Sequence, residues 1–133
     1  MSSISILVAD DYQDWRRKLR ELLRERPELQ VICEASDGLE AVQKAGELKP
    51  NLIILDIGLP KLNGIEAARQ IRRFFPGSKI VFLSQNRDLD VVRAALSTGA
   101  QGYVRKTDVR TDLLLSIEAV LRGEQFVSGT LGG

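Results

Sequence analysis

Short apolar runs alternate along this chain with segments in which apolar residues recur every three or four positions. Runs of the first kind predict strands and segments of the second kind predict amphipathic helices. The predicted strands cover residues 4–9, 31–35, 51–56, 79–83 and 102–105. The predicted helices cover residues 12–26, 39–48, 64–74, 88–98 and 111–122.

The predicted helices have an apolar side and recognisable ends. Pro27 ends the first helix, Asp88 caps the fourth, and Gly99 fits the carboxyl cap of the fourth. The residues predicted to face the core are Trp15, Leu19, Leu22 and Leu23, then Leu39, Val42, Ala45 and Leu48, then Ile65, Ala68 and Ile71, then Val92, Ala95 and Leu96, and finally Leu113, Leu114, Ile117, Val120 and Leu121.

Alternating strands and helices predict an α/β fold with a doubly wound parallel sheet of five strands. The flavodoxin-like order 2-1-3-4-5 places the third strand in the centre. That strand, Leu52–Leu55, is apolar throughout, as expected for a strand covered on both faces. We predict a single domain over residues 1–124 and a mobile, glycine-rich tail over residues 125–133.

Composition narrows the function classes. The 133 residues are 44% hydrophobic with a net charge of +1, which fits one globular domain without a field that attracts nucleic acid. No apolar run approaches the about 20 residues of a membrane helix, and the start lacks a signal peptide. A single cysteine, Cys33, favours a reducing, cytoplasmic location. The chain has no histidine and no P-loop, so histidine-based triads and zinc sites are excluded.

Five polar residues follow the predicted strands. Asp10 and Asp11 follow the first, Asp56 ends the third, Ser84 follows the fourth, and Lys106 follows the fifth. Open parallel sheets bind ligands beyond the carboxyl ends of their strands, so these residues should share one crevice.

Three carboxylates in one crevice require compensation. Two charges about 5 Å apart repel by about 3 kcal/mol at an effective dielectric constant of about 20. Mg²⁺, which prefers oxygen ligands and keeps several waters, would relieve this repulsion. It would leave an Asp56 oxygen free to attack a phosphoryl group, while Lys106 and Ser84 contact the phosphoryl oxygens.

These residues resemble the receiver domain of two-component response regulators over almost the whole chain. The matching positions are Asp10 and Asp11, Asp56 followed by Pro60 and Asn63-Gly64, Ser84, and Gly102-Tyr103 with Lys106. The segments Gly99–Tyr103 and Gly123–Phe126 are similar to the NarL/FixJ type.

The resemblance implies a phosphorelay role in transcription regulation. Asp56 would accept phosphate from a sensor histidine kinase and form an aspartyl phosphate. Asp11 and Asp56 would bind Mg²⁺ directly, Asp10 through water, and the Gly58 carbonyl would complete the protein ligands. The domain would be a phosphoacceptor rather than an enzyme in the ordinary sense, with possible self-catalysed phosphotransfer and dephosphorylation.

A conformational switch is also implied. Phosphorylation would draw Ser84 towards the phosphate and let Tyr103 move inward, which would change the face of the fourth helix, fifth strand and fifth helix. That face could contact a partner or a second copy of the chain. NarL/FixJ-type proteins usually carry a helix-turn-helix, which this sequence lacks, so we expect no direct nucleic-acid binding and either a fragment or a stand-alone receiver.

Two positions depart from the family pattern. Gln85 follows Ser84 where family members often have a smaller residue, and Thr107 follows Lys106 where they often have proline. The bulk of Gln85 could hinder access to Asp56 or slow dephosphorylation.

Alternatives remain for individual residues and for the whole chain. Each aspartate could cap a helix or loop, Ser84 could be an ordinary strand-end hydroxyl, Lys106 a solvated lysine, and Tyr103 a packed aromatic. The basic positions between Arg16 and Arg26 could form a solvated helix face or a kinase-docking surface. A pseudo-receiver that only binds partners is one rival function. A flavodoxin is another, although Asp10-Asp11 would repel the flavin phosphate.

Overall fold

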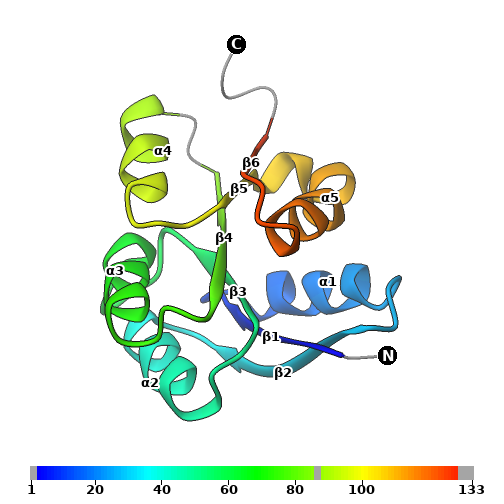
Figure 1. Cartoon of the computed structure of the whole chain (residues 1–133), viewed down its shortest axis with the longest axis horizontal. Coiled ribbons are helices and arrows are strands. Elements are labelled where there is room, and N and C mark those ends of the chain that lie inside the picture. Colours follow the sequence, from blue (N-terminus) through cyan, green and yellow to red (C-terminus); the bar gives the residue numbers. More distant parts are fainter. Residues whose placement is uncertain (1–2, 86–87, 129–133) are drawn as a thin grey trace.

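The structure is a computed structural model that describes residues 3–85 and 88–128. Strands and helices alternate along the chain (Figure 1). The strands are β1 (Ile4–Ala9), β2 (Leu29–Ala35), β3 (Leu52–Asp56), β4 (Lys79–Ser84), β5 (Gly102–Arg105) and β6 (Phe126–Val127). The helices are α1 (Gln13–Leu23), α2 (Gly38–Leu48), α3 (Gly64–Phe74), α4 (Leu89–Leu96) and α5 (Val109–Leu121), and a 3₁₀ turn (Lys106–Asp108) precedes α5.

The sheet has six parallel strands in the order β2-β1-β3-β4-β5-β6. The prediction of a parallel sheet with β3 inside it and β2 at an edge is confirmed, but the prediction of five strands is wrong. Phe126 and Val127, which we expected in a mobile tail, pair with Gly102 and Tyr103. A pair of apolar residues is too short to show strand periodicity, so this strand had no clear signal in the sequence. Residues 129–133 of the expected tail lie outside the described residues.

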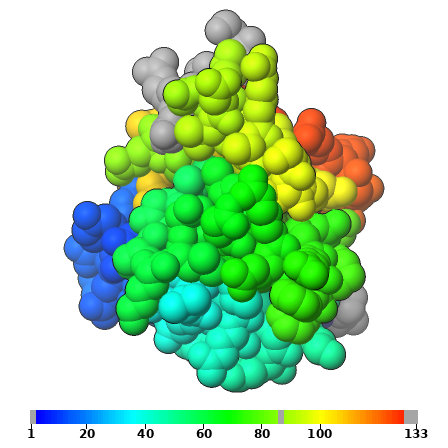
Figure 2. Space-filling view, turned by 90° about the vertical axis from the view of Figure 1, so that its left-hand side faces the viewer, coloured from blue at the N-terminus to red at the C-terminus, as the bar shows by residue number. Residues whose placement is uncertain are grey.

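Helices cover both faces of the sheet. Figure 1 shows α2, α3 and α4 on one side and α1 and α5 on the other, and Figure 2 views the molecule from the side of α2, α3 and α4. All five residues of β3 are buried, in agreement with its central position. No helix in the described part of the chain is both long enough and apolar enough to cross a membrane.

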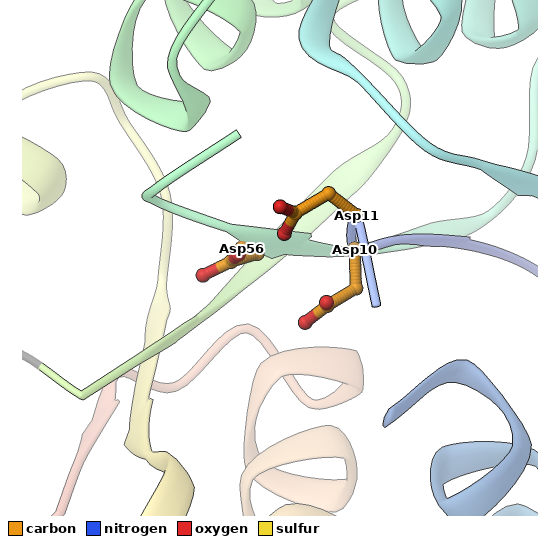
Figure 3. Close-up of side chains that lie close together, drawn as sticks. All are labelled: Asp10, Asp11 and Asp56. Carbon is orange, nitrogen blue, oxygen red and sulfur yellow. The ribbon is translucent and has the colours of Figure 1, made fainter. Parts of the chain in front are cut away.

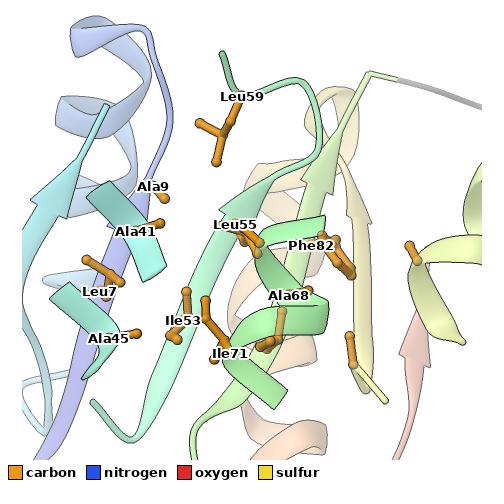
Figure 4. Packing of buried hydrophobic residues seen from close by; sticks show 14 of the residues in the cluster. Leu7, Ala9, Ala41, Ala45, Ile53, Leu55, Leu59, Ala68, Ile71 and Phe82 are labelled. Carbon is orange, nitrogen blue, oxygen red and sulfur yellow. The ribbon is translucent and has the colours of Figure 1, made fainter. Parts of the chain in front are cut away.

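The two faces of the sheet form separate apolar cores. Beneath α2 and α3, Leu7, Ile53 and Leu55 of the sheet pack with Ala68 and Ile71 of α3 (Figure 4). On the other face, the core contains mainly residues of α1, α5 and the sheet: Ile6, Val8, Leu19, Leu23, Leu52, Ile54, Val81, Leu83, Val104, Val109, Leu113, Ile117 and Val120. These cores fix β1, β3, β4 and β5 side by side, so their carboxyl ends share one edge.

The predicted apolar side of α2 is partly wrong. Leu39 and Leu48 are 53% and 48% exposed, whereas Gly38, Ala41 and Ala45 are buried. The ideal Cβ of an added side chain at Gly38 would lie 1.7 Å from the Leu62 carbonyl oxygen, so small residues are required where α2 packs closely. Size, rather than hydrophobicity alone, decides which side of this helix faces inward.

Helix ends agree with the sequence in part. The Asp88 side chain accepts a hydrogen bond from the Asp90 amide, as its predicted capping role requires. Helix α1 ends at Leu23, three residues before its predicted end, and two turns lead to β2. Helix α5 begins at Val109, two residues before its predicted start.

The residue after β6 provides a test of the sixth strand. Ser128 is 1% exposed, its hydroxyl accepts a hydrogen bond from the Arg105 amide at 3.0 Å, and its own amide donates to the Tyr103 carbonyl at 2.9 Å. We expect Ser128→Ala to lower the free energy of unfolding by about 1–2 kcal/mol, because the Arg105 amide loses its acceptor. Urea unfolding followed by circular dichroism measures the change.

Ser97→Ala is the matched control. The Ser97 hydroxyl also bonds to the backbone, donating to the Ala94 carbonyl, but at an exposed position. We expect a change within about 0.5 kcal/mol there. Equal effects of the two substitutions would show that residues 126–128 do not belong to the cooperative sheet.

Candidate functional site

The carboxyl edge of the sheet brings together the polar residues that the sequence analysis selected. Asp10 directly follows β1, Asp56 ends β3, Ser84 ends β4 and Lys106 directly follows β5. Figure 3 shows the carboxylates of Asp10, Asp11 and Asp56 gathered beyond the ends of β1 and β3. The expected convergence is therefore present, although these residues are up to 96 positions apart in the chain.

The three carboxylates form a compact group. One oxygen atom from each of Asp10, Asp11 and Asp56 lies within 4.8 Å of the others. Asp10 is fully buried and Asp56 is 8% exposed, while Asp11 is open to solvent. The group thus has two charges inside the protein and one at its mouth.

The Lys106 ammonium compensates for part of this negative charge. Its Nζ atom lies 2.8 Å from Asp10 Oδ2 and 3.6 Å from Asp56 Oδ1. Lys106 is only 6% exposed, which excludes the alternative of a solvated surface lysine. Such a buried ammonium loses hydration and is stable only with anionic partners.

Asp10 uses both of its carboxylate oxygens within the protein. Oδ1 accepts a hydrogen bond from the Tyr12 amide at 2.9 Å, and Oδ2 accepts the bond from Lys106. The first bond satisfies the amide of Tyr12, the residue just before α1, and does not cap the helix itself. A carboxylate engaged in this way is better suited to contact a metal through water than directly.

The Asp56 carboxyl group is electrostatically unfavourable when it is ionised. Burial raises its pKa above the usual aspartate value; Lys106 opposes this effect, and the Asp10 carboxylate adds to it. The Gly58 amide donates to Asp56 Oδ1 at 3.3 Å and lowers the pKa slightly in turn. A cation bound near Asp56 would therefore stabilise the ionised carboxylate.

Close backbone packing holds the loop after Asp56. The Gly64 amide donates to the Ile57 carbonyl at 2.8 Å, and Asn63 caps α3 by accepting from the Glu66 amide. An ideal Cβ at Gly64 would lie 2.2 Å from the Asp56 carbonyl oxygen, so only glycine fits there. This contact fixes the end of β3 relative to α3.

A cleft of about 780 Å³ opens over the acidic group. It is lined by Asp11, Tyr12, Asp14, Trp15, Asp56, Ile57, Gly58, Ser84, Gln85 and Lys106. Ser84 is 4% exposed, whereas Gln85 is exposed at the rim. The expectation that Gln85 lies where it can restrict access to Asp56 agrees with this placement.

Tyr103 is already inside the protein. Its side chain is fully buried, and burial raises the pKa of its hydroxyl, while a hydrogen bond with the Ser84 side chain acts in the opposite direction. Tyr103 was predicted to move inward when Asp56 is phosphorylated. The structure shows its side chain buried and linked to Ser84.

Trp15 has a contact that the sequence analysis missed. The sequence predicted Trp15 as a core-facing residue of the first helix. The Lys106 Nζ atom lies 4.8 Å from the centre of the Trp15 ring, and Lys18 Nζ lies at the same distance. The only available signal was the place of Trp15 in the first turn of the helix that follows Asp10-Asp11.

Comparison with protein families agrees with this geometry. The sequence model of the family described as "Response regulator receiver domain" matches residues 6–118. The chain belongs to this family. Receiver domains of response regulators are signalling domains rather than classical enzymes, and the relatives of this receiver domain are named as regulators of the NarL type.

Two relatives illustrate the similarity. The receiver domain is 35% identical over 130 residues to the transcriptional regulatory protein LiaR of Bacillus subtilis, covering 98% of this chain and 62% of LiaR. It is 35% identical over 128 residues to the nitrate/nitrite response regulator protein NarL of Escherichia coli K12, covering 96% of this chain and 59% of NarL. The chain thus spans about three fifths of these relatives.

Solved structures show the same fold. A LuxR-family two-component response regulator from Aurantimonas superposes with a TM-score of 0.93 at 32% identity, covering 98% of this chain and 94% of that one. The isolated receiver domain of RcsB from Salmonella enterica, determined with the phosphomimetic BeF₃⁻, has a TM-score of 0.91 at 25% identity, covering 98% and 97% of the two chains.

The residues at the acidic edge fit Mg²⁺ in their chemistry. The donors are carboxylate oxygens, the cluster contains no sulfur or imidazole, and the exposed Asp11 leaves room for metal-bound water. Asp11 and Asp56 would hold the ion, with the Gly58 carbonyl nearby and Asp10 acting through water.

The unfavourable Asp56 charge gives a stability prediction for the metal-free protein. Because the folded-state pKa is raised, folding loses stability as the pH rises from the free aspartate value of 3.8 through the folded value. We expect Asp56→Asn to raise the free energy of unfolding by about 1 kcal/mol at neutral pH, and by progressively less as the pH falls towards 4. Unfolding is measured in EDTA across this range.

Asp37→Ala is the control of opposite sign. Asp37 caps α2 by accepting from the Glu40 amide, and this bond lowers its pKa. Its substitution should destabilise the protein above the free aspartate value, and the effect should fade as the pH falls through the lowered pKa. Destabilisation by Asp56→Asn at neutral pH would contradict the assigned electrostatics.

Proposed function

We propose that this receiver domain is a phosphorylation-controlled switch in which Asp56 accepts a phosphoryl group from a sensor histidine kinase in a Mg²⁺-dependent reaction. The observation that carries the proposal is the group of Asp10, Asp11 and Asp56 around the Lys106 ammonium at the carboxyl edge of the sheet. Family membership over residues 6–118 supports it independently. We place the end of the proposed receiver unit after β6 rather than at the predicted residue 124, because residues 126–128 bond to β5.

The proposed chemistry is an in-line transfer. An Asp56 carboxylate oxygen attacks the phosphorus of a phosphohistidine; the new O–P bond forms as the N–P bond breaks, and the electron pair remains on the imidazole nitrogen. Bound Mg²⁺ would neutralise charge that develops on the phosphoryl oxygens. Asp56 Oδ2 is the better candidate nucleophile, because Oδ1 already contacts Lys106 and the Gly58 amide.

The remaining residues have proposed roles around this step. Lys106 pairs with one phosphoryl oxygen and Ser84 donates its hydroxyl to another. Because Tyr103 is already inward and bonded to Ser84, phosphorylation would stabilise this arrangement over alternatives rather than create it. Gln85 at the rim would limit water access and so prolong the aspartyl phosphate.

The proposed output is control of transcription in the cytoplasm. LiaR is named a transcriptional regulatory protein, and a neighbouring structure is titled as an RcsB–DNA complex. We propose that the face of α4, β5 and α5 contacts a partner or a second receiver, while DNA binding belongs to an output domain outside this chain. The proposed function does not involve a membrane.

The central test uses a small phosphodonor. In Mg²⁺ with acetyl phosphate or phosphoramidate, the intact protein should gain the mass of one phosphoryl group, and Asp56→Asn should abolish the gain. Asp37→Asn, which changes an aspartate outside the cluster, should retain it. A gain that survives Asp56→Asn would disprove the assignment of Asp56. Absence of any gain would favour a pseudo-receiver.

Metal binding has its own readout. Trp15 is the only tryptophan of the chain and lines the same cleft as Asp11 and Asp56. We expect Mg²⁺ to change its fluorescence with a dissociation constant that increases at least about tenfold in Asp11→Asn, because a direct charged ligand is lost. A K⁺ titration serves as the control for ionic strength. An unchanged Mg²⁺ titration in Asp11→Asn would rule out Asp11 as a ligand.

A further inference from the structure

Trp15 occupies a defined place beside the Lys106 ammonium. Lys106 Nζ lies between the Asp10 and Asp56 carboxylates and 4.8 Å from the centre of the Trp15 ring. An ammonium within about 6 Å of an indole centre is attracted by the negative ring face. The Lys106 side chain is 5% exposed, so water does little to weaken this attraction.

The start of α1 fixes the ring relative to the acids. The Tyr12 amide donates to Asp10 Oδ1, and the Arg16 guanidinium donates to the Asp10 carbonyl at 2.6 Å. Trp15 lies between these two anchors in the first turn of α1. Asp10 thus contacts the start of α1, the Trp15 ring of α1 contacts Lys106, and Lys106 contacts Asp10.

Trp15 also lines two clefts. Trp15, Gln85 and Lys106 line both the acidic cleft and a second one of about 390 Å³, whose other lining residues are Lys18, Thr107, Val109 and Arg110. The lining of the second cleft includes cations and no carboxylate, so it offers Lys106 no alternative anionic partner. The ring is thus a third contact of the ammonium, beside the Asp10 carboxylate at 2.8 Å and the Asp56 carboxylate at 3.6 Å.

We propose that Trp15 is a positioning residue for Lys106: its ring holds the ammonium at the point where it contacts both Asp10 and Asp56, within reach of a phosphoryl group arriving on Asp56. This inference rests on the proposed function. The ammonium then needs only a short shift from Asp56 Oδ1 to a phosphoryl oxygen while it keeps its contact with the ring. A weaker ring contact leaves the ammonium less firmly held at this point, which slows phosphorylation.

Fluorinated tryptophan provides the test, since the chain has a single tryptophan and the replacement is therefore site-specific. Each added fluorine weakens the negative face of the ring with little change in shape. The rate constant of Asp56 phosphorylation by acetyl phosphate should fall by about 3- to 10-fold from tryptophan to tetrafluorotryptophan. Its logarithm should fall steadily with the number of fluorines. A flat or rising series would overturn the proposal.

Lys18 is the necessary control because it lies equally close to the ring. In Lys18→Met the fluorine dependence should persist, since Lys106 is the ammonium that matters. Loss of the dependence in Lys18→Met would assign the effect to Lys18 and contradict the proposal. Trp15→Phe should retain part of the rate, and Trp15→Leu should lose at least as much as full fluorination.

A spectroscopic measurement does not depend on phosphorylation. In the metal-free protein, the ε-methylene protons of Lys106 should be shifted upfield by the indole ring current, and Trp15→Leu should remove the shift. Lys106→Arg identifies the signal by its loss. Absence of this shift in the native protein would contradict the proposed contact.

The outcomes separate the inference from the proposed function. If native protein gains no phosphoryl group on Asp56, the proposed function fails, whereas the ring-current shift still tests the contact. If Asp56 is phosphorylated at a rate independent of fluorination, the proposed function stands and the role of Trp15 is refuted.

Discussion

A single buried ammonium makes this acidic edge compatible with a folded protein. Asp10 and Asp56 are almost fully removed from water, and among residues 3–85 and 88–128 Lys106 is the cation that contacts both. Two buried carboxylates without it would repel each other and have no hydration to compensate. The pairing is nevertheless incomplete, since the pKa of Asp56 remains raised. The site is thus stable enough to form, and a further positive charge would stabilise it.

The sheet makes this pairing possible. Asp10, Asp56 and Lys106 come from three strands that are fixed by two apolar cores, one on each face. The side chains at the edge contribute little to those cores, so chemistry and packing are separated in space. Small residues complete the arrangement, as Gly64 shows, because any side chain there would collide with the Asp56 backbone.

The parts of this protein that follow from local pattern could be predicted from the sequence. The apolar run Leu52–Leu55 predicted the central strand. The acids at the strand ends predicted that polar side chains converge at its carboxyl end. The exposure of Leu39 and Leu48 could not be predicted from periodicity, because α2 packs through its small residues and Gly38 approaches the Leu62 backbone too closely for any side chain. The contact between Trp15 and Lys106 joins residues 91 positions apart, and no local pattern encodes such a pair. The inward position of Tyr103 depends on its contact with Ser84 on the neighbouring strand, which is equally non-local.

The short strand β6 changes what a movement of Tyr103 entails. Strand β5 is flanked by β4 on one side and β6 on the other, and Ser128 bonds to the backbone of both Tyr103 and Arg105. A displacement of the Tyr103 backbone must either break the bond to the Ser128 amide or drag residues 126–128 along. Movement of Tyr103 and movement of the chain segment after β6 are therefore mechanically coupled.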